Sequence, residues 1–254
     1  MFNRKPIIEF FSVNPAFDHV AKPGNSRKFF PDWIKRLKMT SKISGGQRLP
    51  PNVPELDTVR KCAPFLDVMR AGYIIPAPAD MWFKITNNGG VYNTDYRTSL
   101  NLQGDTVELI SEHVPEQLGS EHTFGKLALK FNNPWIIKTR PGYSCLFTSP
   151  FNHGNKYFEC FSGVVDTDNY GNIINFPFRI LNADNKDTWE FTIKRGDPLV
   201  QIIPFKRSDV YGKIKVTKAS DKQWKKLNCD NDLVSGNFSW YREKINENKI
   251  TLEK

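Results

Sequence analysis

The chain of 254 residues lacks several features that would each place it in a familiar class of protein. It has no apolar run near the ~20 residues that a membrane-spanning helix needs, so we expect no membrane association. Glu9 interrupts the apolar stretch that follows Arg4 and Lys5, which is not typical of a secretory signal. The cysteines lie far apart, without a CxxC metal pair or a dense disulfide framework (Cys62, Cys145, Cys160 and Cys229). We therefore expect a reducing, cytoplasmic environment.

Aromatic residues and positive charge are abundant instead. Aromatic residues make up 13% of the chain, with 19 Phe and 6 Trp. These residues can fill a hydrophobic core, and their abundance excludes a largely disordered chain. Lys and Arg number 36 against 27 Asp and Glu, so the formal net charge is +9. Such a surplus favours binding to polyanions such as nucleic acid, an anionic capsid surface or phosphorylated ligands. A solvated basic surface without a specific partner explains the same charge, and composition leaves both interpretations open.

Residues 1–60 are expected to form a Pro-rich, basic N-terminal arm with one short helix. Prolines interrupt this region repeatedly (Pro6, Pro15, Pro23, Pro31, Pro50, Pro51 and Pro54). The helix is predicted from residue 31 to about residue 42, because proline suits a first helical position and Trp33, Ile34 and Leu37 fall on one face. We expect this face to pack on the main domain, while a basic amphipathic helix also suits contact with a membrane or nucleic acid.

Residues 61–210 have the pattern of a mainly β domain. About ten short runs rich in β-branched and aromatic residues are separated by turn signals, such as residues 87–90 (Asn-Asn-Gly-Gly) and residues 140–142 (Arg-Pro-Gly). The runs do not alternate with helical patterns, which argues against a doubly wound α/β fold. The pattern favours an all-β sandwich or barrel.

Residues 211–254 are predicted to form a helical tail with two short helices. The first starts at Ser220 or Asp221, either of which suits a helix cap, and the second covers residues 239–246. The first helix contains Trp224 followed by two lysines, and residues 28–33 show a similar mixture of aromatic and basic residues. Single-stranded nucleic-acid binders use such mixtures as stacking platforms, but Trp residues beside lysines also occur in helices that face a core. The sequence does not decide between these interpretations.

Four segments of the β region resemble, in order, the motifs of trimeric dUTPases. Residues 71–73 (AGY) resemble the first motif, and residues 140–147 (RPGYSCLF) resemble a Pro-Gly-Tyr turn and the strand that follows it. Residues 163–173 (GVVDTDNYGNI) resemble the third motif, and residues 193–203 (IKRGDPLVQII) resemble a strand with Gly-Asp and Gln. dUTPases and dCTP deaminases share the β-clip fold. The resemblance therefore implies a β-clip-like barrel or sandwich over residues 61–210, and a homotrimer with sites between subunits.

The resemblance also implies catalytic positions, but most of them carry other residues here. Asp166 matches the Asp that positions the attacking water. Asn169 stands where the family has a Tyr under the deoxyribose, and Tyr170 is displaced by one position. Ile74 replaces the Asp that holds magnesium through water, residues 148–151 (Thr-Ser-Pro-Phe) replace a Pro-Arg-Ser-Gly phosphate signature, and the Gly-rich C-terminal lid is missing. Because triphosphate hydrolysis needs the charge clamp and the metal together, we do not expect the dUTPase reaction.

Two classes of function therefore stay open. The first is a non-catalytic β-clip protein that acts in assembly or binding, as a virion or regulatory component. The chain as a whole resembles proteins of tailed phages and some bacteria in residues 76–80, 133–135 and 141–143, which suggests a phage protein in the host cytoplasm or virion. Expected partners are further copies of the chain, other virion or host proteins, and nucleic acid at the basic surface.

The second class is a nucleotide hydrolase or deaminase with a rebuilt site around Asp166 as its catalytic residue. Mg²⁺ is expected as a cofactor only in this case, and no cofactor is expected otherwise. The residues that could bind a ligand there are Arg140, Tyr143, Asp168, Tyr170 and Arg179. A cluster of Arg or Lys beside Asp166 would favour a phosphate ligand, because guanidinium groups pair with phosphate in a bidentate manner.

Two pairs of Glu and His would suit a divalent metal, namely residues 112–113 and 121–122. Pro115 and Gly119 break any helix between them, so a polar loop is the favoured interpretation and no metal site is predicted.

Two further pairs have both a chemical and a structural interpretation. His153 and Cys160 would form a nucleophilic pair across a hairpin, whereas a buried structural Cys is the commoner case. Asp166 and Asp168 would form a paired-carboxylate site, whereas the simpler account is an Asx-type turn in which each Asp caps local backbone donors.

Overall fold

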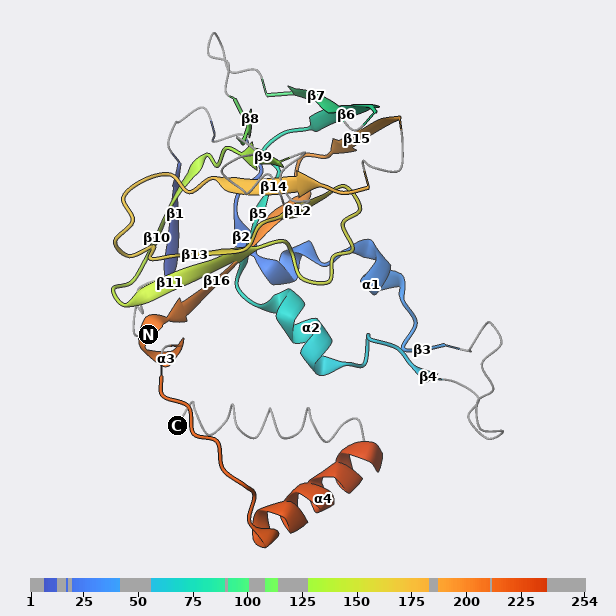
Figure 1. Cartoon of the computed structure of the whole chain (residues 1–254), viewed down its shortest axis with the longest axis vertical. Helices are drawn as coiled ribbons and strands as arrows, with labels where there is room; N and C mark the ends of the chain where they lie inside the picture. Colours follow the sequence, from blue (N-terminus) through green and yellow to red (C-terminus); the bar gives the residue numbers. More distant parts are fainter. Residues whose placement is uncertain are drawn as a thin grey trace. The chain divides into compact units, whose positions relative to one another are not determined.

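The computed structural model of the chain describes residues 7–12, 17, 20–41, 56–89, 91–100, 108–113, 128–182, 187–210 and 212–236. Figure 1 shows the chain with its helices and strands labelled. The chain divides into two compact units. The β unit consists of Met1–Pro31 and Met69–Tyr211, and the second unit consists of Asp32–Val68 and Gly212–Lys254. The helix predicted for residues 239–246 and the Glu-His pair at residues 121–122 lie outside the described residues.

The largest sheet of the β unit has five strands, and all its pairings are antiparallel. In spatial order they are β13 (Gly163–Val165), β11 (Tyr143–Thr148), β16 (Pro198–Lys206), β5 (Tyr73–Pro76) and β2 (Gly24–Asn25). The register pairs Cys145 with Val165 and Tyr143 with Lys206. The end of β13, the start of β11 and the end of β16 therefore meet at one edge of this sheet.

Three smaller antiparallel sheets complete the β unit. One contains β12 (Phe158–Cys160), β14 (Phe176–Ile180), β9 (Ala128–Phe131) and β8 (Ile110–Glu112). Another contains β15 (Thr188–Ile193), β6 (Met81–Asn88) and β7 (Val91–Thr98). The third pairs β1 (Ile8–Ser12) with β10 (Trp135–Thr139). The mainly β fold class is confirmed, and the finer β-clip arrangement stays a prediction.

Stacked aromatic rings from several sheets form the centre of the core. Phe131 of β9 stacks on Phe178 of β14 with ring centroids 3.8 Å apart. Phe83 of β6 stacks on Phe191 of β15 at 4.9 Å, and its edge meets Phe178 at 6.2 Å. The alternation of buried and half-buried residues along β6 and β14 places these rings on the inner faces. The high aromatic content of the sequence therefore serves the core, as expected.

The first 31 residues are not separate from the β domain, in contrast to the arm expected over residues 1–60. Their strand β1 pairs with β10 along its whole length, from Ile8 opposite Thr139 to Ser12 opposite Trp135. Ile8 is buried in the core, and the ring of Phe10 meets that of Tyr73 edge-on at 6.1 Å. Burial of these apolar side chains explains why the segment joins the sheet.

Two elements in the β region differ from the sequence-based expectation. The region begins with a helix, α2 (Ala63–Arg70), where only strands were expected. Residues 157–165 are one of the runs rich in β-branched and aromatic residues, which predicts one strand, but they are divided into β12 and β13 in different sheets. The ladder from β12 ends where the backbone N–H of Phe161 bonds to Pro177 and the chain leaves this sheet. A local pattern does not show which sheet a strand joins, because cross-strand packing decides it.

In the second unit, the helix predicted from residue 31 is shorter than expected. It is α1 (Asp32–Arg36), and it is followed by a two-stranded ladder of β3 (Thr40–Ser41) and β4 (Leu56–Asp57). The Thr58 hydroxyl donates to the carbonyl of Lys38, and the Thr58 backbone N–H donates to the carbonyl of Met39. These carbonyls are bonded to the segment that contains β4, so the helix ends before them. Trp33 packs edge-on against Phe65 of α2, and the buried residue of α1 is Ile34.

The helix predicted at residue 220 is present as α4 (Asp221–Gly236). Ser220 and Gln223 form a capping box, since the Ser220 hydroxyl accepts from the Gln223 backbone N–H and Gln223 Oε1 accepts from the Ser220 N–H. A short helix, α3 (Arg207–Val210), directly follows β16 in the β unit. Among the described helices, none has the length and apolar character needed to span a membrane.

Candidate functional site

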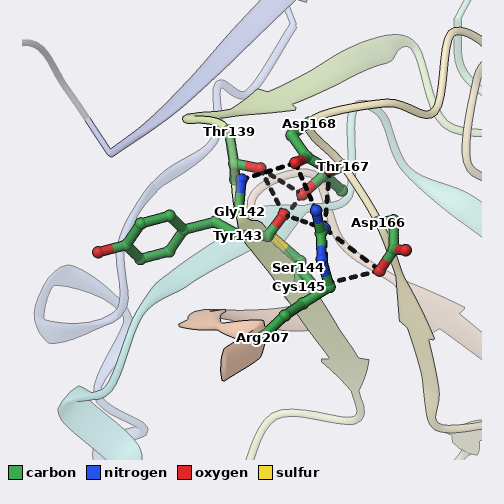
Figure 2. A network of polar contacts seen from close by, with 9 residues as sticks. All are labelled: Thr139, Gly142, Tyr143, Ser144, Cys145, Asp166, Thr167, Asp168 and Arg207. Atoms are coloured by element: carbon green, nitrogen blue, oxygen red, sulfur yellow. Dashed lines mark hydrogen bonds and ion pairs between the residues drawn. The ribbon is translucent and has the colours of Figure 1, made fainter. Parts of the chain in front are cut away.

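The candidate site is a polar network at the edge where β13, β11 and β16 meet (Figure 2). The turn after β13 carries Asp166, Thr167 and Asp168, and β11 contributes Ser144. Arg207 is the first residue after β16 and lies between the two carboxylates. The antiparallel register brings these residues together although they are up to 63 residues apart in sequence.

Arg207 and Asp168 form the strongest interaction of the network. Arg207 Nη1 donates to Asp168 Oδ1 at 2.8 Å and Nη2 donates to Oδ2 at 2.6 Å, which is a bidentate ion pair. The backbone N–H of Gly142 donates to the same carboxylate at 2.8 Å. The Asp168 side chain is only 6% exposed and that of Arg207 is 26% exposed. The hydrogen bonds from Arg207 lower the pKa of Asp168 to about 2, so this carboxylate is ionised at neutral pH.

Asp166 is held at the same edge but faces solvent. Its Oδ1 accepts from the Ser144 hydroxyl at 2.6 Å and lies 3.4 Å from Arg207 Nη1. Its side chain is 58% exposed, and Oδ2 has no partner among the described residues. One oxygen of Asp166 is therefore available to a ligand, whereas both oxygens of Asp168 are occupied.

The Asx-type turn expected for the two Asp residues is only part of the arrangement. The backbone does turn here, since the N–H groups of Asn169 and Tyr170 bond to the carbonyl of Asp166. The carboxylates themselves bond chiefly to Ser144, Gly142 and Arg207, which are more than 20 residues away. The pair therefore links the turn to β11 and α3.

A row of small polar side chains lies behind the carboxylates. The hydroxyls of Thr139 and Thr167 are 2.7 Å apart, and Thr167 donates to the Cys145 sulfur at 3.3 Å. Thr167 and Cys145 are fully buried, and burial raises the pKa of the Cys145 thiol to about 11. Since the thiolate is the nucleophilic form, Cys145 has a structural role here.

The possible nucleophilic pair of His153 and Cys160 has the wrong electrostatics for that chemistry. Burial lowers the pKa of His153 to about 4 and raises the pKa of the Cys160 thiol. Both groups are therefore neutral at pH 7, whereas a nucleophilic Cys needs a lowered pKa. The Cys160 sulfur instead lies 3.5 Å from the carbonyl oxygen of Leu199.

The structure brings only some of the predicted ligand-binding residues to this edge. Tyr170 is exposed, and its carbonyl accepts from Lys138 Nζ at 2.6 Å. Tyr143 contributes its carbonyl, which accepts from Arg207 and Thr139, but its ring points away from the network (Figure 2).

The two arginines proposed as phosphate ligands do not join the network. Arg179 lies on β14 and forms an ion pair with Glu159 of β12, in a different sheet from Asp166. Arg140 occupies the turn before β11, where its backbone N–H bonds to Ile7 and its carbonyl accepts from Tyr143. The cation beside Asp166 is Arg207, which the sequence analysis missed. The only sequence signal for it is its place directly after the last strand.

The positions that match the remaining catalytic motifs have structural roles. Ile74, at the magnesium position, is fully buried. Thr148 accepts from Ser162, and Ser149 accepts from the Cys160 N–H, so both hydroxyls of the altered phosphate signature are used within the protein. Within the described ranges, no three His, Cys, Asp or Glu residues are grouped as a metal site would require.

The first and the last of the four dUTPase-like segments, residues 71–73 and 193–203, contact each other at Gly72. Gln201 donates from Nε2 to the carbonyl of Ala71 at 2.7 Å and accepts from the N–H of Phe151 at 2.9 Å. The Ser26 hydroxyl donates to the same carbonyl. Gly72 has φ +68°, and a Cβ there would lie 1.9 Å from the carbonyl oxygen of Ile202. The motif residues Gly72 and Gln201 therefore fix the contact between β5 and β16.

The ion pair at Asp168 predicts a specific pH dependence of stability. Its pKa falls from an ordinary 3.8 to about 2 on folding, so its stabilising effect is complete above pH 3.8 and is lost as the pH falls through 2. We expect the stability difference between the wild type and Asp168→Asn to be constant above about pH 4 and to shrink below it. Urea midpoints measured from pH 7 to pH 2 test this. A difference that does not change with pH would contradict the ionised pair.

No protein-family model matches the chain, and no curated protein sequence is similar to it.

Proposed function

We propose that the chain is a non-catalytic β protein that acts by binding or assembly. One observation carries this proposal, namely that both Nη atoms of Arg207 form bonds within the protein. Its guanidinium bonds to both oxygens of Asp168, to the carbonyl of Tyr143 and to the hydroxyl of Ser144. A phosphate at this edge would have to displace the Asp168 carboxylate, which is already in an ideal bidentate position.

The resemblance adds a biological setting to this proposal. A virion or regulatory component of a phage, working in the host cytoplasm or the virion, would use the β scaffold as a platform. The homotrimer that the resemblance implies stays a prediction. Exposed apolar residues in the C-terminal part support a binding role, because solvent exposure of such residues is unfavourable without a partner. Ile214 and Val216 are 91% and 89% exposed.

The alternative is a nucleotide enzyme with a rebuilt site, and one observation favours it. Asp166 keeps a free oxygen in solvent, and the exposed Tyr170 is only four residues further along the turn. A carboxylate and an aromatic ring could contact a base and a sugar, with Mg²⁺ as a further ligand of the carboxylate. Arg207, the cation that contacts Asp166, is already held by Asp168, which makes this the weaker candidate.

A thermal-shift panel tests the proposal. The chain is heated with deoxynucleoside and ribonucleoside mono- and triphosphates, with and without Mg²⁺, and release of phosphate or ammonia is measured in parallel. We expect no turnover and no shift, because Arg207, the cation that contacts Asp166, is already paired with Asp168. A ligand at ~100 times its Kd would add about 2.7 kcal/mol, which is roughly 5–10 °C for a domain of this size.

Asp166→Asn is the matched control for this panel. It keeps the size of the side chain and removes the charge. A nucleotide that raises the Tm of the wild type by several degrees, but not that of Asp166→Asn, would overturn the non-catalytic proposal if turnover accompanies it. An unchanged Tm for both proteins would support it.

A further inference from the structure

Positive charge is dense in one short segment near the C-terminus. Residues 213–226 contain six lysines and a single carboxylate, that of Asp221 (Lys213, Lys215, Lys218, Lys222, Lys225 and Lys226). The segment therefore carries a net charge of +5, compared with +9 for all 254 residues. We call residues 213–226 the basic segment. A second basic stretch lies at residues 27–42, with six Lys or Arg and one Asp.

The lysines of the basic segment are exposed and have no acidic partner among the described residues. Every residue from 213 to 226 is exposed, and none of the six lysines forms an ion pair with a described residue. Residues 212–220 form neither helix nor strand, and α4 begins at Asp221. A run of unneutralised cations on an exposed chain attracts a polyanion, since the release of counterions favours binding.

Trp224 lies among these lysines and is also exposed. It is in the first turn of α4, its side chain is 60% exposed, and its ring contacts no other ring in the described part of the chain. The structure therefore disagrees with the interpretation of Trp224 as a core-facing residue with lysines pointing outward. An exposed indole between cations can stack on a nucleobase.

The second stretch of aromatic and basic residues, at residues 28–33, is different. Trp33 packs on Phe65, and Phe30 lies under the guanidinium of Arg70 at 5.6 Å. Lys35, which follows this stretch, forms an ion pair with Asp32. Phe30 and Trp33 of this stretch are thus engaged within the protein, whereas Trp224 of the basic segment contacts no ring in the described part of the chain.

We propose that the basic segment binds single-stranded nucleic acid, with the lysines on the phosphates and Trp224 stacked on a base. A single strand fits better than a duplex, because paired bases do not offer their faces to an indole. An anionic membrane fits less well, because only four of the 16 residues of α4 are large and apolar (Trp224, Leu227, Leu233 and Val234), and a surface-bound helix needs a broader apolar face. This inference rests on the binding part of the proposed function and is independent of the carboxylate network.

The test measures binding of the full-length chain to a fluorescein-labelled oligo(dT) of about 20 nucleotides by fluorescence anisotropy at several salt concentrations. If about five lysines contact phosphates, the slope of log Kobs against log salt is roughly −3.5. Affinity then falls about 100-fold between 50 and 200 mM salt. We expect Trp224→Ala to weaken binding on the order of ten-fold with little change in slope, and Trp224→Phe to retain most of the affinity.

A matched pair of triple variants separates the basic segment from general charge. Lys222→Gln/Lys225→Gln/Lys226→Gln should reduce the size of the slope by about 2. The control removes three exposed lysines from other places, none of which forms an ion pair with a described residue, and it should bind like the wild type (Lys22→Gln/Lys28→Gln/Lys156→Gln). Equal losses in the two triple variants would overturn the assignment to this segment.

Three further results would also overturn the inference. They are no binding to oligo(dT) at 50 mM salt, equal affinity for a duplex of the same length with no effect of Trp224→Ala, and binding only to vesicles that contain phosphatidylglycerol. Failure here is distinct from failure of the proposed function, because nucleotide turnover is measured separately. A chain that neither binds oligo(dT) nor turns over nucleotides would remain a non-catalytic protein with another partner.

Discussion

Replacing Gly72 with alanine is expected to destabilise the β unit by about 3–5 kcal/mol. The new Cβ would lie 1.9 Å from the carbonyl oxygen of Ile202 and 2.9 Å from its carbonyl carbon, and both are backbone atoms. The contact cannot relax by a change of rotamer, so β5 and β16 must separate where Tyr73 is paired with Ile202. The left-handed φ of +68° adds about 1 kcal/mol of strain for a residue with a side chain.

Gly89→Ala is the matched control for the steric part of this effect. Gly89 has φ +65°, almost the same as Gly72, but no atom lies within 4 Å of the position of its Cβ. We expect this variant to lose only about 1 kcal/mol, from backbone strain alone. Urea unfolding followed by circular dichroism gives both values. Similar losses in the two variants would show that the close approach of β16 to Gly72 is not a real constraint.

Replacing Arg207 with methionine is expected to cost about 2–4 kcal/mol. Methionine keeps the apolar stem and removes the charge that neutralises the nearly buried Asp168. Breaking a buried ion pair from one side leaves an uncompensated charge, for which ~3–5 kcal/mol is typical, and the partial exposure of Arg207 reduces this value. The carbonyl of Tyr143 loses its bond to Arg207 as well.

Arg179→Met provides the comparison for this effect. It also removes one arginine from an ion pair, but Arg179 and its partner Glu159 are on the surface, with side chains 32% and 48% exposed. Such pairs contribute about 0–1 kcal/mol. The double variant Arg207→Met/Asp168→Asn should recover part of the loss, because it also removes the unpaired charge. Equal costs for Arg207→Met and Arg179→Met would contradict a structural role for the Arg207–Asp168 pair.

The two predictions concern different contacts of the same five-stranded sheet. Gly72 lets β5 approach β16, and Arg207 ties the end of β16 to the turn after β13. Both residues lie in or beside segments that resemble the dUTPase motifs, yet their contacts are with the protein itself. A residue of such a motif can serve the reaction or the fold. Here the contacts of Gly72 and Arg207 show a role in the fold. These contacts support a scaffold role.

Part of the candidate site could be predicted from the sequence, because its residues lie in one short turn. Asp166, Asp168 and Tyr170 were placed together by the resemblance of residues 163–173, and they share one turn in the structure. Their partners could not be predicted. Ser144 and Arg207 are 22 and 39 or more residues away, and only the register of β11 with β13 and β16 brings them close.

The sequence alone determined the mainly β class, the approximate strands and the capped start of α4, because these depend on neighbouring residues. Alternation of apolar side chains, turn residues and the Ser220–Gln223 box act over a few positions. Only the tertiary structure decided that Ile8 to Ser12 pair with β10, that Arg207 neutralises Asp168, and that Trp224 is exposed while Trp33 is packed. These outcomes depend on burial and strand pairing between segments that are far apart in the chain. A pattern of neighbouring residues does not show which distant segments will pack together.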